Sequence, residues 1–274
     1  MHKRDTYAGQ MPEAPELVRG VLYQRAAASR FQLHQYPPSA ALAPFVEYYW
    51  VVRWDLRGQP PHEQAILPHP TVHLTFEPER AAIYGVVTKL YVRRIEGQGA
   101  TLGIRFRPGG FRPFWPEPIS RLTGQLVAAS QLLGSAAEQA RQVVVTDPAD
   151  DVIIGRVQAL LESVRPERDP AAEQVAGMAE RIVSDPALRR VDQLAATLQT
   201  PVRRLQRLFA DYVGVSPKWV MRRARLHDAA LRAEQGGPVD WAALAADLGY
   251  SDQAHLTRDF TATIGEPPAR YAGG

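Results

Sequence analysis

The sequence predicts an α+β protein with a strand-rich N-terminal domain and an all-helical C-terminal domain. Up to about residue 110, short aromatic and β-branched runs alternate with Pro and Gly turn signals, which indicates an antiparallel barrel or sandwich. From Ile119 onward the composition shifts to Ala, Leu, Gln and Arg, and no strand pattern occurs after residue 171. A length of 274 residues is enough for two domains of roughly 100–200 residues each.

The predicted strands are short and are separated by turns. They cover residues 45–54, 71–76, 81–87, 90–95 and 101–106. Three helices are predicted next, near 119–132, 135–145 and 150–164. The charged segment from Arg165 to Pro170 contains two prolines and is the predicted linker between an N-terminal domain, 1–165, and a C-terminal domain, 171–274.

Composition excludes several classes of protein. The chain has no cysteine, so a disulfide framework, a cysteine zinc site and a thiol nucleophile are excluded. No apolar run approaches the ~18 residues of a membrane span, and the segment from Met1 to Pro12 has no apolar stretch like that of a signal peptide. We therefore expect a cytoplasmic protein that does not contact membranes.

An internal repeat is the most informative feature of the sequence. The pattern Leu-Ala-Ala-x-Leu occurs at 194–198 and at 244–248, and Leu-x-x-x-Phe with Arg in the third position follows at 205–209 and 256–260. Each copy then ends in Gly-x-x-Pro, which begins at Gly214 and Gly265. The repeat predicts one structural unit that is used twice.

Each copy reads as two short helices with a tight turn, which is a helix-turn-helix unit. The units cover about 191–213 and 240–264. In the second, Asp240 and Ser251 or Asp252 are suited to cap the two helices, and Gly249 is suited to end the first. Ser216 followed by Pro217 predicts the start of a spacer helix, 216–235, about 27 Å long.

The charge pattern supports contact with nucleic acid. Residues 201–232 contain eight basic and two acidic side chains, whereas the whole chain has a net charge of only +3. Arg reads guanine and Gln reads adenine through paired hydrogen bonds. The side chains predicted to contact base edges are Arg203, Gln206, Arg207, Gln253, His255 and Arg258. Those predicted to contact phosphates are Arg204, Thr257, Lys218, Arg222 and Arg223.

These motifs resemble the C-terminal DNA-binding domain of the AraC/XylS family of bacterial transcription regulators. The resemblance covers about 100 residues and includes the string at 249–260 and the Gly-Glu-Pro-Pro at 265–268. It implies that the base-reading set named above, together with Ala254, faces double-stranded DNA. RNA polymerase and a second copy of the chain are further partners that it suggests. The first unit departs from the family pattern at Gln199, where a turn glycine is common, and at Pro201.

The N-terminal region resembles a sensor-like domain that occurs in some regulators of this family. The strings at 66–76 and 103–110 carry this resemblance, although His73 stands where related chains have an acidic residue. It implies an effector-binding or dimerising domain. Tyr48 and Trp50 share one face of a predicted strand and Tyr49 faces the other; with Arg105 they could line an apolar pocket. A simple core cluster is the favoured reading, so Trp50 and Arg105 are only candidate effector contacts.

The sequence does not favour a metal site or an enzyme active site. A metal site at His62, His69, His73 and Glu77 is disfavoured, because two histidines four residues apart on a strand lie ~13 Å apart. No Gly-x-Ser-x-Gly elbow or phosphate-binding loop is present, so we expect no catalytic residue, metal or cofactor. Two alternative functions remain. One is a helical protein–protein adaptor without DNA binding, and the other is an enzyme-like N-terminal domain that binds a metal or ligand.

Overall fold

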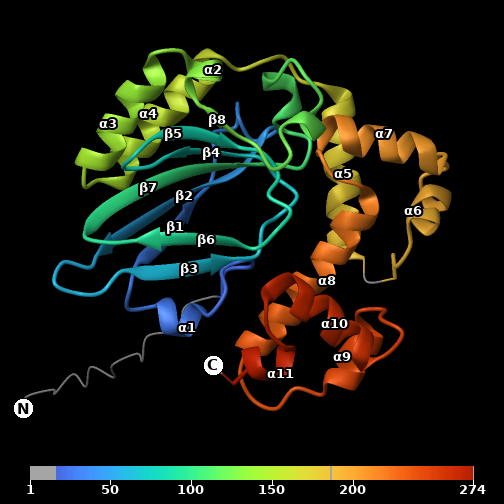
Figure 1. Cartoon of the computed structure of the whole chain (residues 1–274). Coiled ribbons are helices and arrows are strands. Elements are labelled where there is room, and N and C mark those ends of the chain that lie inside the picture. The colour runs from blue at the N-terminus through green and yellow to red at the C-terminus, as the bar shows by residue number, and fades with distance from the viewer. Residues whose placement is uncertain (1–16, 186, 274) are drawn as a thin grey trace, which may run out of the picture.

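The computed structural model describes residues 17–185 and 187–273 (Figure 1). The expectation for the start of the chain, at Met1 to Pro12, lies outside the described residues. The fold class is as predicted: an antiparallel sheet-rich region is followed by helices and by an all-helical C-terminal region. Within the described ranges, no helix is both long and apolar enough to cross a membrane.

The N-terminal region contains two antiparallel sheets. The six-stranded sheet has the order β1-β2-β7-β4-β5-β8, and the second sheet pairs β3 with β6. The strands are β1 (Gln32–Tyr36), β2 (Val46–Asp55), β3 (His62–Ile66), β4 (His73–Phe76), β5 (Ala81–Tyr84), β6 (Tyr91–Ile95), β7 (Gln98–Phe106) and β8 (Leu126–Ala128). A short helix, α1 (Gln24–Ala27), precedes them.

One face of the six-stranded sheet is covered by helices (Figure 1). Tyr49, Val51 and Leu102 on that face are almost completely buried against α3 (Ala136–Thr146) and α4 (Asp150–Ser163). The strand period of two sends Tyr48 and Trp50 to the opposite face, toward β3 and β6. The sheet therefore has a packed side and a side that encloses a cavity.

The predicted helix at 119–132 is wrong. Ile119–Arg121 forms one 3₁₀ turn, η2, and only Ser130–Leu133 is α-helical, as α2. Between them Leu126–Ala128 forms β8, which pairs with β5 at the edge of the large sheet. Gly124, at positive φ, lies between η2 and β8 and interrupts a continuous helix there. A further 3₁₀ turn, η1 (Arg112–Phe114), follows β7.

The C-terminal region is built from seven helices within its described residues. They are α5 (Pro170–Ser184), α6 (Val191–Thr197), α7 (Val202–Tyr212), α8 (Pro217–Glu234), α9 (Trp241–Asp247), α10 (Gln253–Ile264) and α11 (Pro268–Tyr271). Helix α8 runs between the α6–α7 unit and the α9–α10 unit (Figure 1). Each unit has its own apolar core, one around Phe209 and the other around Phe260.

Candidate nucleic-acid interface and ligand cavity

The two helix-turn-helix units have the same turn geometry, as the sequence repeat predicts. After α6 the Thr200 amide donates to the Ala195 carbonyl over 2.9 Å, and after α9 the Tyr250 amide donates to the Ala245 carbonyl over 2.9 Å. Gly249 takes the left-handed conformation, with φ 72°. At the equivalent position Gln199 also has a positive φ, 47°, although it carries a side chain.

The caps that the sequence predicts are present. The Ser216 hydroxyl accepts a hydrogen bond from the Trp219 amide at the start of α8. Asp240 accepts from two amides of α9, and Asp252 accepts from the His255 amide over 2.7 Å at the start of α10. Capping of α10 orders the first turn of that helix, in which the predicted base-reading residues of the second unit begin.

The predicted base-reading side chains lie on open surface. In each unit the second helix buries its apolar stripe, Leu205 and Phe209 in α7 and Leu256 and Phe260 in α10. The exposed residues on the other faces of these helices are Arg203, Gln206, Arg207, Gln253, His255 and Arg258. The structure thus leaves every one of these side chains accessible, and their roles toward bases remain a prediction.

The structure corrects one of the predicted phosphate contacts, that of Arg223. It is only 4% exposed, its guanidinium lies 4.6 Å from the Trp219 ring centre, and Nη2 donates to the carbonyl of Thr88 in the sheet region. Burial lowers the pKa of Arg223 to about 10, so the group stays charged near neutral pH. Arg223 joins the spacer helix to the sheet region, and its burial disfavours the predicted contact with a phosphate.

The other predicted phosphate contacts differ in accessibility. Arg204 and Lys218 are exposed, and Thr257 is half-buried. Arg222 is exposed but forms an ion pair with Asp259 of α10. The sequence pattern missed two residues that tie the units together: Arg225 donates to the Arg189 carbonyl over 2.6 Å, and Arg189 in turn donates to the carbonyl of Ala246 in α9.

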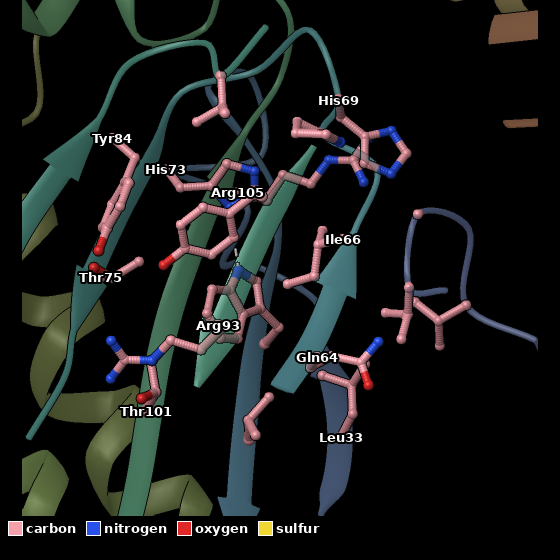
Figure 2. Close-up of a pocket in the computed structure, with 18 of the residues that line it drawn as sticks. Leu33, Gln64, Ile66, His69, His73, Thr75, Tyr84, Arg93, Thr101 and Arg105 are labelled. Carbon is pink, nitrogen blue, oxygen red and sulfur yellow. Dashed lines mark hydrogen bonds between the residues drawn. The ribbon is translucent and has the colours of Figure 1, made fainter. Parts of the chain in front are cut away.

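A cavity of about 210 Å³ lies between the two sheets (Figure 2). Its lining is mostly apolar and includes Phe31, Leu33, Trp50, Val52, Trp54 and Ile66. Tyr48, Trp50 and Arg105 therefore line a cavity, and the favoured reading of a simple core cluster is wrong for them. Trp115 packs on the opposite, helix-covered side of the sheet.

Glycines allow the tryptophans to lie flat on the neighbouring strand. Trp50 of β2 pairs with Gly103 of β7, where an added Cβ would stand 2.1 Å from the indole. Trp54 lies over Gly99 in the same way. Close approach of an aromatic ring to the backbone requires glycine at these positions.

The candidate metal residues do not meet. His69 and His73 are separated along the chain as expected, and His69 instead stacks on His227 of α8 with ring centres 4.1 Å apart. His73 receives a hydrogen bond from Trp50, and Glu77 pairs with Arg93. In the described parts of the chain, no group of three or more His, Cys, Asp or Glu residues is arranged to hold a metal ion.

The wall of the cavity is also the contact surface for the spacer helix. His69 and Arg19 both line the cavity. On its other side, Arg19 forms an ion pair of 3.0 Å with Asp228 and donates to the Ala224 carbonyl, both in α8. His227 lies within 3.3 Å of the Pro68 carbonyl and is almost completely buried. No sequence motif indicates this interface, because its residues come from segments about 150–200 positions apart.

Comparisons with known proteins support the helix-turn-helix units that the sequence repeat predicts. Residues 194–273 match the family model of a helix-turn-helix domain, and residues 34–128 match a family described as a domain of unknown function (DUF6597). The C-terminal region is therefore a DNA-binding domain of the class found in transcription regulators. More particularly, it is a helix-turn-helix domain of the AraC type, which confirms the resemblance stated for this part of the sequence.

Solved structures of ToxT from Vibrio cholerae are also similar to the chain, at a low level. A single-substitution variant of apo ToxT is 10% identical with a TM-score of 0.37, and the match covers 93% of this chain and 95% of that chain. A 1.65 Å structure of ToxT is 11% identical with a TM-score of 0.39, over 89% and 98%. ToxT bound to an unsaturated fatty acid is 9% identical with a TM-score of 0.37, over 92% of each chain. No curated protein matches the sequence.

Proposed function

We propose that the protein is a sequence-specific transcription regulator that inserts α7 and α10 into two successive major grooves and responds to a small-molecule effector held between its sheets. The division into domains at 1–165 and 171–274 is part of this proposal. The observation that carries it is the repeated unit, because both copies present an exposed Arg- and Gln-bearing helix on one spacer. The spacer has 18 residues, about 27 Å, which suits grooves one turn, ~34 Å, apart.

An effector role for the sheet cavity is supported by its wall. A ligand that contacts His69 or Arg19 touches the residues that hold α8, and α8 carries both DNA-reading units. Regulation requires that the ligand binds two arrangements of the protein with different affinity. The residues shared by the cavity lining and the α8 contact supply such a difference in affinity. A shift of His69 would change both the shape of the cavity and the surface on which His227 packs.

Base reading is tested by two matched substitutions. Selection of bound fragments from the source genome would first define a specific site. On that site we expect Arg207→Ala and Arg258→Ala each to lose ~1–3 kcal/mol of binding free energy and to relax the preference at one base pair. Arg94→Ala, on the exposed side of β6, is the control and should bind like the wild type. Equal losses on specific and random DNA would contradict base reading by these side chains.

Phosphate contact is tested by the dependence of affinity on salt. Each neutralised phosphate contributes a slope of about 0.9 in a plot of log affinity against log salt. Arg204 is exposed beside the reading face of α7, so Arg204→Ala should reduce the slope by about one contact. Arg94→Ala should leave the slope unchanged. A slope that Arg204→Ala does not alter would show that Arg204 does not contact a phosphate, and an absence of measurable DNA binding would argue for the protein–protein adaptor alternative.

A further inference from the structure

The charged groups of the sheet cavity are already paired with one another or with neighbours. Arg105 lies 2.9 Å from Glu47, and Arg93 lies 3.2 Å from Glu77 and 2.9 Å from Glu79. Arg19 has Asp228 as its partner at 3.0 Å. Each arginine among the described lining residues thus faces a carboxylate. A charged ligand would have to break one of these pairs or remain uncompensated in a mostly apolar cavity.

From this charge balance we propose that the cavity binds an uncharged, mainly apolar molecule, about the size of one aromatic ring with a short chain, that carries a single hydrogen-bond acceptor. The inference rests on the proposed role of the cavity as the effector site and names the chemical class of the effector. An apolar cavity on the order of 150 Å³ is enough for benzene. A cavity of about 210 Å³ therefore leaves room for a ring and a few further heavy atoms.

The position of the acceptor follows from a hydrogen-bond chain at one end of the cavity, where His73 and Arg105 lie near each other (Figure 2). Trp50 Nε1 donates to His73 Nδ1 over 3.3 Å, so the proton of the neutral ring lies on Nε2. This Nε2 is 3.2 Å from Thr71 Oγ1 and donates to it. The Thr71 hydroxyl proton has no further partner among the described residues and can be donated to a ligand.

A second donor stands at the same end. The Tyr48 hydroxyl accepts a hydrogen bond from Arg105 Nη1 over 2.8 Å, which leaves its own proton for a ligand. Arg105 is thereby held by Glu47 on one side and by Tyr48 on the other, with its side chain only 11% exposed. Two hydroxyl donors beside a neutralised arginine suit a carbonyl, ether or hydroxyl oxygen. The rings of Trp50, Trp54 and Phe31 suit the apolar part of the molecule.

Three probes of nearly equal shape test this inference in the full chain by titration calorimetry. They are 4-phenyl-2-butanone, which is uncharged, 3-phenylpropanoate, in which a carboxylate oxygen replaces the ketone methyl, and 3-phenylpropylammonium. We expect the ketone to bind at least tenfold more tightly than either ion. Binding of the carboxylate as tightly as the ketone, or no measurable binding of the ketone, would overturn the inference.

Substitution of Glu47 provides the decisive variant. In Glu47→Gln the charge of Arg105 loses its partner, so the preference should shift toward 3-phenylpropanoate by tenfold or more. Glu63→Gln, an exposed carboxylate of β3, is the matched control and should keep the wild-type preference. An unchanged preference in Glu47→Gln would contradict the charge balance. DNA binding by the unliganded protein is measured separately, so failure of these titrations is distinguishable from failure of the proposed regulator function.

Discussion

At the scale of single residues, the two repeats differ in sequence at Gln199 and its equivalent Gly249, but both residues have a positive φ. The φ of 47° at Gln199 places a residue with a side chain in the left-handed region, where the equivalent Gly249 has φ 72°. The cost of this conformation for a residue other than Gly is roughly 1–2 kcal/mol, and Gly in turn loses more chain entropy on folding. The first unit therefore tolerates a strain that the second avoids.

This difference gives a stability prediction. We expect Gln199→Gly to raise the free energy of unfolding by about 1 kcal/mol, since relief of strain exceeds the extra entropy of glycine. Gly249→Gln is the mirror substitution and should lower it by a similar or larger amount. Urea unfolding of both variants checks the sign. A destabilised Gln199→Gly would mean that the Gln199 side chain makes a compensating contact.

At the scale of elements, the helical units could be predicted because their signals are local. Ser216, Asp240 and Asp252 cap the helices that the sequence assigned to them, and Gly249 ends α9 as expected. Strands depend on partners far away in the chain. The segment 126–128 reads as helix in isolation, but in the structure its backbone bonds to Ala82–Tyr84 decide its conformation.

The cavity was less predictable for the same reason. Alternation along β2 correctly separated Tyr48 and Trp50 from Tyr49, but it could not show what faces them. The opposite wall comes from β3 and β6, and β3 carries the polar sequence His-Glu-Gln at its start, which gave no strand signal. The burial of Arg223 was hidden similarly, because its partner Thr88 lies 135 positions away.

The spacer helix provides the prediction at this scale. Ser216 is its N-cap, and its hydroxyl accepts from the Trp219 amide over 3.2 Å. Loss of such a cap costs about 1 kcal/mol, so Ser216→Ala should lower the unfolding free energy by this amount. Ser216→Asp keeps an acceptor and should be nearly neutral. Thermal unfolding followed by circular dichroism distinguishes them, and equal midpoints for all three proteins would show that the cap contributes nothing.

At the scale of the whole molecule, the sheet region contacts the helical C-terminal region at several separate places. The first unit is held by the ion pair of Arg112 with Asp211 and by the Thr123 hydroxyl, which donates to the Gly214 carbonyl over 2.7 Å. The end of the spacer helix that leads to the second unit is held by Glu234 of α8, which accepts from the backbone amides of Tyr23 and Gln24 near α1. Between these contacts, the stacked rings of His69 and His227 hold the spacer helix against the sheet region.

The histidine pair predicts that the stability of the folded protein depends on pH. Burial, with added repulsion from nearby arginines, holds the pKa of both His69 and His227 well below their ordinary value of 6.5. Burial likewise lowers the pKa of His73 to about 3. Because the folded-state pKa values are lowered, the unfolded chain binds more protons below pH 6.5. The stabilising contribution is complete above pH 6.5 and is lost as the pH falls.

We therefore expect the free energy of unfolding to fall between pH 6.5 and 5 by about 1.4 kcal/mol per pH unit for each buried neutral histidine. In His227→Asn one titrating group is absent, so the slope should decrease by that amount, measured by urea unfolding at several pH values. His255→Asn changes an exposed histidine of α10 and should leave the slope unchanged. A slope that His227→Asn does not reduce would mean that His227 is protonated, or undocked from His69, in the folded protein.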